Sequence, residues 1–288
     1  MAEPVVALES SLITHGFAPP RNLQVAREIE QAVRDAGAQP ATIAVLQGQV
    51  KIGLTDDELA YLAQAKAARK CSLRDLGIVI GLGLDGSTTV AATMFLAAKH
   101  GIQVFATGGI GGVHRGHPFD VSADLTELSR TPVTVVCAGA KALLDLPLTF
   151  EHLETLGVPV IGYGSDEIPA FYSRSSGLKA SVRADTPQDV VRIVRARRAL
   201  KLPGGELVCV PVPREAELSA DVAEAAIAEA QRRADAEGIS GPDATPFMLD
   251  QIARLTGGAS VRANVALLLN NARVAAEIAR ALAGSPLS

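Results

Sequence analysis

The sequence is poor in aromatic residues and has no tryptophan. Aromatic residues make up 3% of its 288 residues, although 48% of the chain is hydrophobic. A hydrophobic core of this composition is built mainly from alanine, valine, leucine and isoleucine, which suits a parallel sheet covered by helices. We therefore expect a single α/β domain over residues 1–288, with α/β/α layers, a mostly parallel central sheet and a helical C-terminal layer.

Cysteine is also scarce. Cys71, Cys137 and Cys209 are far apart in the sequence and form no CxxC pair. An odd number of scattered cysteines is typical of a reducing compartment. Cys137 and Cys209 lie in apolar, strand-like runs, which predicts buried and unreactive thiols.

The chain has neither an excess of basic residues nor a long apolar run. Lys and Arg number 27 against 31 Asp and Glu, a net charge of −4, so we expect no broad nucleic-acid-binding surface. A small pocket for one phosphate remains compatible with this charge. No apolar run reaches about 18 residues, and no signal peptide precedes VVALES at 5–10. We therefore expect a cytoplasmic protein that binds no membrane and acts on a small molecule.

Short apolar segments alternate with amphipathic segments along the chain, as is typical of α/β proteins. Strands are expected at 5–8, 42–46, 49–52, 78–80, 104–106, 133–137, 158–161 and 207–210, with a hairpin around Gln47-Gly48. Helices are expected at 22–36, 87–100, 219–237, 245–255 and 259–282. A capping box from Thr55 to Glu58 and the Thr-Pro pairs at 186–187 and 245–246 mark further helix starts.

The segment 81–86 reads GLGLDG and matches the glycine pattern of dinucleotide-binding loops. That pattern also requires an acidic residue about 20 positions further on, which binds the ribose hydroxyls. The next expected strand leads into ATG at 106–108 without one, so the sequence disfavours a nicotinamide cofactor. The segment GSTTV at 86–90 remains a candidate phosphate site, because it places free backbone N–H groups and hydroxyls at a helix start. A plain N-cap by Ser87 is the alternative.

Two charged residues follow expected strands. Glu9 ends the first strand, and a carboxylate at that position of an α/β sheet faces the ligand-binding crevice, where it can act as a general acid. Lys141 follows the strand 133–137 and the small residues Ala-Gly-Ala, and a poorly solvated lysine there can act as a nucleophile. Considered alone, each has a simpler explanation: a loop cap for Glu9 and a solvated side chain for Lys141.

The stretch 105–141 is rich in glycine and in polar residues. Five glycines between Gly108 and Gly116 suggest a backbone that lies close against a ligand. Asp120 and Asp124 follow on either side of Ser122, and such carboxylates suit a hard ion such as Mg²⁺ or Mn²⁺ held largely by water. The alternative is that one of them caps a helix starting near residue 123.

Long blocks of the chain resemble the pseudouridine-5′-phosphate glycosidases, the family that includes the indigoidine-synthase-A-like proteins. The matching blocks are VVALES-LITHG (5–16), PATIA (40–44), K-SLRDL (70–76), ATGGIGGVHRG (106–116), FDVSADL (119–125), VTVVCAGAK (133–141), GVPVIGY (157–163), TPF (245–247) and LTGG (255–258). They occur in this order over nearly the whole chain, which is more specific than any short motif.

The resemblance implies reversible cleavage of pseudouridine 5′-phosphate to uracil and ribose 5-phosphate. In the family, a lysine attacks C1′ of the ring-opened ribose, and the carbon–carbon bond then breaks to leave a Schiff base. Lys141 occupies the place of that lysine, and Glu9 matches the proton-transferring glutamate. Asp120 matches the ligand of a divalent ion, which is Mn²⁺ in the family and could also be Mg²⁺.

The resemblance also implies a set of substrate contacts and an assembly. The matching positions are Lys70, Thr89, Val90, His114, Ser122, Ala123, Asp124 and Asn264. Lys70 and the helix start at Thr89 and Val90 fit phosphate capture, and a homotrimer is expected. The loop Gly116-His117-Pro118 is about two residues shorter than in familiar members, which leaves the role of His117 and the metal coordination open. Another Schiff-base sugar-phosphate lyase or aldolase, or a non-catalytic phospho-sugar-binding protein, is the alternative function.

Overall fold

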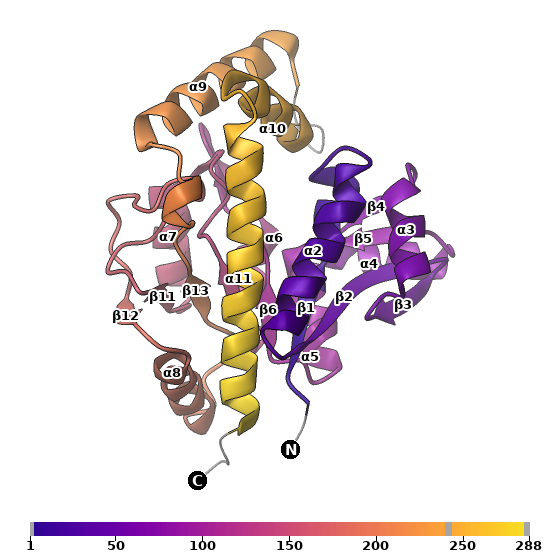
Figure 1. The fold of residues 1–288 in the computed structure, drawn as a ribbon, viewed down its shortest axis with the longest axis vertical. Coiled ribbons are helices and arrows are strands. Elements are labelled where there is room, and N and C mark those ends of the chain that lie inside the picture. The colour runs from indigo at the N-terminus through magenta and orange to yellow at the C-terminus, as the bar shows by residue number, and fades with distance from the viewer. Residues whose placement is uncertain (1–2, 240–243, 285–288) are drawn as a thin grey trace.

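The computed structural model describes residues 3–239 and 244–284 and has a ten-stranded sheet at its centre (Figure 1). The strand order is β12 (Val182–Ala184), β11 (Val160–Tyr163), β13 (Leu207–Cys209), β9 (Thr134–Cys137), β6 (Val104–Ala106), β1 (Val5–Glu9), β2 (Gln39–Leu46), β5 (Gly86–Thr88) and β4 (Arg69–Cys71), with β3 (Gln49–Ile52) paired to β2. Neighbouring strands are parallel except where β2 meets β3 and β5. The predicted mostly parallel sheet is therefore confirmed.

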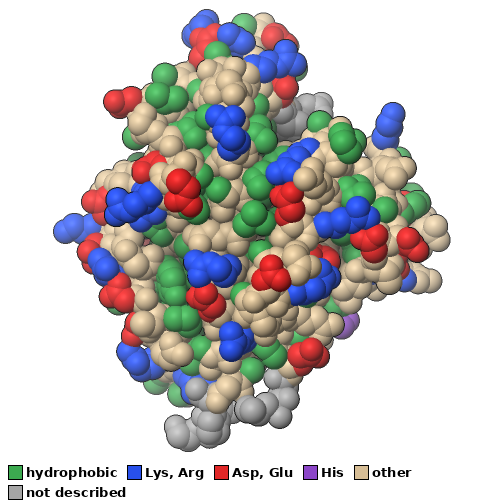
Figure 2. Space-filling model, viewed as in Figure 1, with side chains coloured by type: hydrophobic (Ala, Val, Ile, Leu, Met, Phe, Trp, Pro, Cys, Tyr) green, Lys and Arg blue, Asp and Glu red, His purple; other side chains and the backbone are tan. Residues whose placement is uncertain are grey.

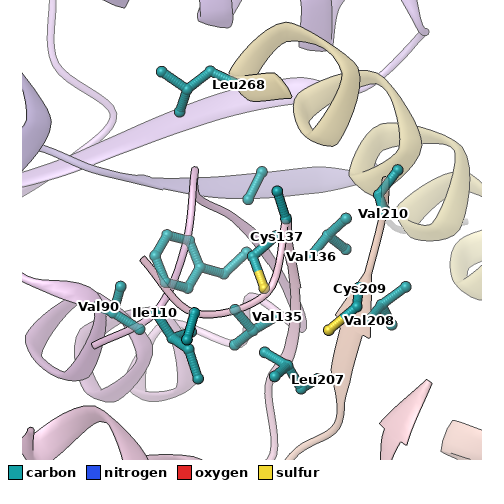
Figure 3. Close-up of a cluster of buried hydrophobic side chains, with 14 of the residues drawn as sticks. Val90, Ile110, Val135, Val136, Cys137, Leu207, Val208, Cys209, Val210 and Leu268 are labelled. Atoms are coloured by element: carbon teal, nitrogen blue, oxygen red, sulfur yellow. The ribbon is translucent and has the colours of Figure 1, made fainter. Parts of the chain in front are cut away.

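Helices cover both faces of this sheet. One face carries the long C-terminal helix α11 (Ala259–Gly284), which packs against β1, β6 and β9 and lies between α2 (Arg21–Asp35) and α8 (Pro187–Ala199) (Figure 1). The opposite face carries α5 (Val90–Lys99), against which α6 (Ala123–Leu128) packs. The core between these layers is aliphatic, as the composition predicts, and Figure 3 shows β9 and β13 side chains at its centre.

Several helix ends form where the sequence places them. α3 (Asp56–Gln64) begins with the predicted capping box, in which the Thr55 side chain accepts from the Glu58 N–H and the Glu58 side chain accepts from the Thr55 N–H. α8 begins after Thr186, whose side chain accepts from the Asp189 N–H. The C-terminal helices α9 (Ala220–Glu237) and α10 (Ala244–Leu255) precede α11. The predicted cap at Thr245 falls on side chains outside the described residues.

The segment 78–80 is not the expected strand, because it belongs to the helix α4 (Leu73–Gly81). The Ser72 N–H donates to the Asp75 carboxylate at 3.1 Å at the start of this helix, and Leu76 and Val79 are buried at helical spacing. A short apolar run does not distinguish a strand from a helix by itself. The GLGLDG pattern thus follows a helix, which removes the strand context that a dinucleotide-binding loop needs.

The helix expected at 87–100 starts later than predicted. Residues 86–88 form β5, which pairs with β4, and α5 begins after the N-cap residue Thr89. A Cβ at Gly86 would lie 2.9 Å from a Val79 methyl carbon, so close packing of α4 on β5 accounts for the glycine. Ser87 is a buried strand residue and not a helix cap.

A second, three-stranded sheet follows the glycine-rich segment. Its strands are ordered β10 (Leu144–Asp145), β7 (Val113–His114) and β8 (His117–Val121). His114 pairs with His117, so the shortened loop is a tight turn formed by Arg115 and Gly116, and Gly116 has a φ of +73°. The remaining elements are α1 (Ser11–His15), α7 (Leu146–Thr155) and the 3-10 turn η1 (Arg214–Ala216).

The cysteines and the surface agree with the composition. All three cysteines are buried and unpaired, and Cys137 lies opposite Cys209 on neighbouring strands (Figure 3). Their hydrogen bond, together with burial, raises the pKa of the Cys209 thiol. On the face drawn in Figure 2, basic and acidic side chains are interspersed. Among the helices that the structure describes, none is long and apolar enough to cross a membrane.

Candidate active site at the carboxyl ends of β1, β6 and β9

The carboxyl ends of β1, β6 and β9 meet where the order of the strands along the sheet changes direction. β1 lies between β2, which follows it in sequence, and β6, which comes after the chain has returned from β4 and β5. Open α/β sheets bind ligands at such a switch point. Glu9 ends β1, Thr107 follows β6, and Lys141 follows β9 after the segment Ala-Gly-Ala. The topology therefore brings the two predicted catalytic residues to the same end of the sheet.

Glu9 is held in one orientation by two hydroxyl groups. Its side chain is buried, with Thr107 donating to one carboxylate oxygen and Ser11 to the other. Thr107 is itself anchored, because its N–H donates to the Val136 carbonyl at 3.0 Å and its carbonyl accepts from the Asn271 amide at 2.9 Å. A carboxyl group fixed in this way is positioned for proton transfer to a ligand in the adjoining cavity.

Lys141 is positioned by its backbone. Its N–H donates to the Ile110 carbonyl at 3.0 Å, and Ala140 forms an isolated parallel bridge with Ile110. Gly139 just before it has a φ of +85°, which favours glycine, and a Cβ there would lie 2.7 Å from the Pro169 carbonyl oxygen. Within the described parts of the chain, no hydrogen bond or ion pair occupies the Lys141 amino group. The amine is thus available to a ligand.

Lys141 lines two adjoining cavities. The inner cavity, of about 80 Å³, is largely apolar and also contains Glu9 and Asn264. Its apolar wall is formed mainly by Leu12, Phe17, Phe171, Tyr172, Leu249, Ile252 and Leu268. The second cavity, of about 180 Å³, is polar and is lined by Ser11, Lys70, Ser72, Thr89, Gly111, His114, Ser122, Asp124, Lys141, Leu143 and Leu144. A ligand that occupies both must pass the Lys141 amine.

Lys70 also faces both cavities and carries an altered acidity. Burial lowers the pKa of Lys70, and the positive charge of Lys141 lowers it further. The carboxylates of Glu9 and Asp124 oppose this change. Burial and then the charge of Lys70 lower the pKa of His15, which lies on the same cavity wall, so its ring is neutral near neutral pH. A group carrying negative charge would relieve the repulsion between the two lysines.

Asp124 is a structural carboxylate in this chain. It is buried and accepts from the Ala91 N–H at 2.9 Å and from the Gly111 N–H at 2.8 Å. It therefore caps the N-terminus of α5, a position at which negative charge is favourable. Asp124 itself lies in the first turn of α6, whose N-cap is Ser122, so the alternative in which an aspartate caps that helix is wrong.

The backbone N–H groups of Thr88, Thr89 and Ala91 are not the free phosphate donors that the sequence suggests. The Thr88 N–H donates to Ser10 at 2.9 Å and the Thr89 N–H to the Cys71 carbonyl at 3.0 Å, while Asp124 occupies the Ala91 N–H. The Thr89 hydroxyl, in contrast, is buried without a partner within the described residues and borders the polar cavity. The groups available to an anion here are thus chiefly the Thr89 hydroxyl and the Lys70 amine, and not a series of backbone N–H groups.

The glycines at 109–112 are required chiefly by the protein's own packing. A Cβ at Gly109 would lie 2.7 Å from a Phe171 ring carbon, and one at Gly112 would lie 2.3 Å from the Thr149 hydroxyl. At Gly111 it would lie 2.3 Å from the Ser122 hydroxyl oxygen. Gly108, Gly109 and Gly111 do line the cavities. The prediction that this glycine-rich backbone lies close against a ligand is therefore only partly right. At 109, 111 and 112, neighbouring residues fill the space that a side chain would occupy.

The remaining predicted residues differ in burial and in the cavity that they line. His114 and Ser122 line the polar cavity and also a larger outer cavity of about 800 Å³, which contains His117 and Asp120. Val90 is buried, so only its backbone can serve a ligand, and Ala123 is exposed in the first turn of α6. Within residues 3–239 and 244–284, no group of three His, Cys, Asp or Glu side chains could hold a metal ion. Asp120 is an exposed single carboxylate on β8.

Several residues of the site were not predicted from the sequence. Ser11, His15 and Thr107 line the inner cavity, and each lies within a few positions of Glu9 or at the end of β6. Their hydroxyl and imidazole groups in ESSLITHG and FATGG were the available signal. Phe171 also lines the inner cavity, but no local pattern marks it. It lies in a loop, has a left-handed φ of +60° and packs on Gly109, which is distant in sequence.

The family model for indigoidine synthase A like protein matches residues 1–281. The chain belongs to this family. It is 55% identical over 281 residues to the pseudouridine-5′-phosphate glycosidase of Jannaschia sp. (strain CCS1), covering 97% of this chain and 93% of that protein. It is 57% identical over 281 residues to the pseudouridine-5′-phosphate glycosidase of Chloroflexus aurantiacus, covering 96% and 92%.

Two solved structures share the fold. An indigoidine synthase A-like protein from Thermotoga maritima superimposes with a TM-score of 0.90 at 36% identity, covering 96% of this chain and 92% of that one. The prealnumycin C-glycosynthase AlnA, in complex with ribulose 5-phosphate, also has a TM-score of 0.90, at 43% identity and 98% and 92% coverage. The mixed α/β fold predicted from the sequence is thus shared over almost the full length of both proteins.

Proposed function

We propose that this protein is a pseudouridine-5′-phosphate glycosidase. It reversibly cleaves the carbon–carbon bond between uracil and the sugar of pseudouridine 5′-phosphate, releasing uracil and ribose 5-phosphate. Full-length relatives more than 50% identical to the chain carry that name. The observation that carries the proposal is the position of Lys141, whose side chain lines both an apolar and a polar cavity. A nucleotide that spans them would have C1′ beside the amine.

Each cavity suits one part of the substrate. The inner cavity has an apolar wall with Asn264 as a polar group, which suits the flat uracil ring. Lys70 and the unpartnered Thr89 hydroxyl border the polar cavity, and they would bind the phosphate together with the backbone at Val90. The structurally similar AlnA binds ribulose 5-phosphate, so a pentose phosphate is a ligand that this fold accepts.

Lys141 acts as the nucleophile and Glu9 as the proton donor. The neutral lysine amine bonds to C1′ as the ribose ring opens: the bond between C1′ and the ring oxygen breaks, a carbon–nitrogen bond forms, and the proton that the amine loses passes to the ring oxygen. The bond between C1′ and the base carbon then breaks, and its electron pair stays on the base carbon, which takes a proton from the Glu9 carboxyl group. The resulting imine is hydrolysed by water to ribose 5-phosphate and free Lys141. Thr107 and Ser11 keep the Glu9 carboxyl group in place through these steps.

A divalent ion, Mn²⁺ or Mg²⁺, is proposed to bind at Asp120. The donor set fits a largely hydrated ion, because Asp120 is a single exposed carboxylate and such ions keep several waters while using one or two carboxylates. When bound, the ion would supply positive charge to the oxygen atoms of the sugar phosphate. The nearby His114 and Ser122 line the same outer cavity and orient the substrate's polar groups.

The decisive experiment incubates the protein with pseudouridine 5′-phosphate and follows uracil by its ultraviolet absorbance. Lys141→Ala should lose turnover by more than about 10³-fold, whereas the exposed-lysine control Lys66→Ala should not. Glu9→Gln should lose turnover yet keep most of its substrate affinity, because the carboxyl group acts mainly on proton transfer. Borohydride with ribose 5-phosphate should trap an adduct on Lys141.

The alternatives give other outcomes in this experiment. A lyase or aldolase acting on other sugar phosphates would form the borohydride adduct but release no uracil. A phospho-sugar-binding protein would bind ribose 5-phosphate without an adduct. Normal turnover of Lys141→Ala without an adduct would show that the Schiff-base mechanism is wrong. For the metal, Asp120→Asn should weaken Mn²⁺ binding, measured from the spectrum of free Mn²⁺, by at least about tenfold, and Asp57→Asn on α3 should not.

We further propose that the protein is a cytoplasmic homotrimer. Unpaired, buried cysteines support a reducing compartment. Support for an assembly comes from large apolar side chains that a single chain leaves in contact with solvent, including Phe119, which is 99% exposed, and Leu82, which is 70% exposed.

A further inference from the structure

Arg115, at the turn between β7 and β8, joins three parts of the molecule. Its Nε donates to the Leu144 carbonyl at 3.1 Å, and its Nη2 donates to the Ala142 carbonyl at 3.1 Å. Its two terminal nitrogens also form a bidentate pair with Glu224 of α9, at 2.8 and 2.9 Å. The hydrogen bonds to Glu224 raise the pKa of Arg115, so the guanidinium stays charged.

The two carbonyl contacts hold the chain just after Lys141. Ala142 follows Lys141 directly, and the Leu144 N–H donates back to the Lys141 carbonyl at 3.0 Å. Before Lys141, the bridge between Ile110 and Ala140 holds the chain. The chain is therefore held both before and after Lys141. After Lys141, the side-chain contacts that hold it come from Arg115.

The contact with Glu224 reaches a different element. α9 packs chiefly against α10, and the two helices project beyond the sheet as a separate pair (Figure 1). Gln231 and Asp235 of α9 line the outer cavity, and Leu249 and Ile252 of α10 line the inner one. The helix pair α9–α10 therefore covers part of the site, and Arg115 links this pair to the segment that carries Lys141.

The ion pair by itself adds little to folding stability. The side chains of Arg115 and Glu224 are 31% and 56% exposed, and pairs as exposed as this are largely screened by solvent. The planar guanidinium, with donors in a fixed fork, is in contrast well suited to hold two carbonyls and a carboxylate at once. The arrangement is thus better explained by positioning than by stability.

We propose that Arg115 is a positioning residue for Lys141. Through its contacts with Ala142 and Leu144, Arg115 fixes where the lysine amine lies relative to the sugar. Through Glu224, it holds the helix pair α9–α10 over the bound substrate. The inference rests on the proposed function, since it concerns the rate at which Lys141 reacts. It assigns no contact between Arg115 and the substrate.

The first test variant, Arg115→Lys, removes the planar guanidinium group but keeps the positive charge. Arg115→Lys cannot bind both carbonyls and Glu224, so we expect kcat for uracil release to fall about 10- to 100-fold, the cost of a displaced reacting group. KM should change much less than kcat. In a single turnover with saturating substrate, the rate of borohydride trapping on Lys141 should fall in parallel with kcat, while the unfolding temperature stays close to that of the unchanged protein.

A second variant separates the two contacts. Glu224→Gln leaves the carbonyl contacts of Arg115 in place and removes only the ion pair, so kcat should stay within about twofold while KM rises and depends less on salt. The control is Arg27→Lys, which alters a bidentate pair with Asp56, at 2.8 and 2.7 Å, between α2 and α3. We expect no change in kcat or KM there.

The outcomes are distinct. If the unchanged protein releases no uracil, the proposed function fails before any variant is compared. If it does, an unchanged kcat in Arg115→Lys, or a loss of turnover that only follows a loss of folded protein, overturns the positioning role. An equal fall of kcat in Glu224→Gln would overturn the assignment to the carbonyl contacts.

Discussion

The positive charge of Lys141 lowers the pKa of Lys70, and neither lysine has an ion-pair partner within the described residues. Burial and this neighbouring charge both disfavour the protonated form of Lys70. A substrate phosphate would restore the balance by binding Lys70. At the scale of single residues, the proposed site therefore combines a cation that would bind the phosphate with an amine that would react.

A pH dependence follows from Lys70. Because its pKa is lowered from 10.5, the side chain loses its proton at a lower pH than a free lysine. If it binds the phosphate as a cation, KM should rise on the alkaline side, by up to about tenfold for each pH unit above that pKa. Arg remains charged throughout this range, so KM of Lys70→Arg should stay flat. KM measured from neutral pH upward checks this, and parallel profiles would contradict it.

At the scale of elements, one carboxylate joins two of them. Asp124, at the start of α6, accepts from Ala91 in the first turn of α5 and from Gly111 in the glycine-rich segment. Ser122 packs against Gly111 from the same side. The glycine-rich segment thus takes its path from helix capping and side-chain packing, and that path places Lys141 by way of Ile110.

This packing predicts opposite effects for two Gly→Ala changes. In Gly111→Ala the new methyl group would lie 2.3 Å from the Ser122 hydroxyl and 2.8 Å from the Asp124 carboxylate. We expect the free energy of unfolding to fall by about 1–3 kcal/mol, with loss of uracil release. Gly77, on the exposed side of α4, has no atom within 4 Å of a new Cβ, so Gly77→Ala should stabilise the protein by up to about 1 kcal/mol. Urea denaturation measures both, and equal effects would contradict the packing argument.

At the scale of the whole molecule, the ten-stranded sheet places the site and the surface suggests an assembly. The exposed apolar side chains include Ile78 and Ile80 on the outer side of α4, besides Leu82 and Phe119. A helix that exposes isoleucines on its outer side is unusual for a surface that meets only water.

The proposed trimer can be tested in solution. We expect light scattering to give a mass near three times the 29.8 kDa of one chain. Phe119→Ser should shift the mass towards the monomer if this side chain is covered by another copy, and Lys66→Ala should leave it unchanged. A monomeric mass for the unchanged protein would refute the assembly.

Local patterns were sufficient for much of the fold. The strands β1, β3 and β6 and the capped starts of α3 and α8 lie where the sequence predicts them. The error at 78–80 arises because a short apolar run takes its conformation from what it packs against. Residues 86–88 form a strand because they pair with β2 and β4, which are distant in sequence. The same limit applies to Phe171 and Arg115, whose roles depend on residues distant in sequence.

The sequence by itself determined the class of fold, the aliphatic core and the strand-end positions of Glu9 and Lys141, because hydrophobic periodicity and chain order are local properties. Only the tertiary structure decided that these residues share a cavity, that Asp124 caps α5, and that packing occupies the space beside the glycines. Those features depend on contacts between segments far apart in the chain, which no local pattern contains.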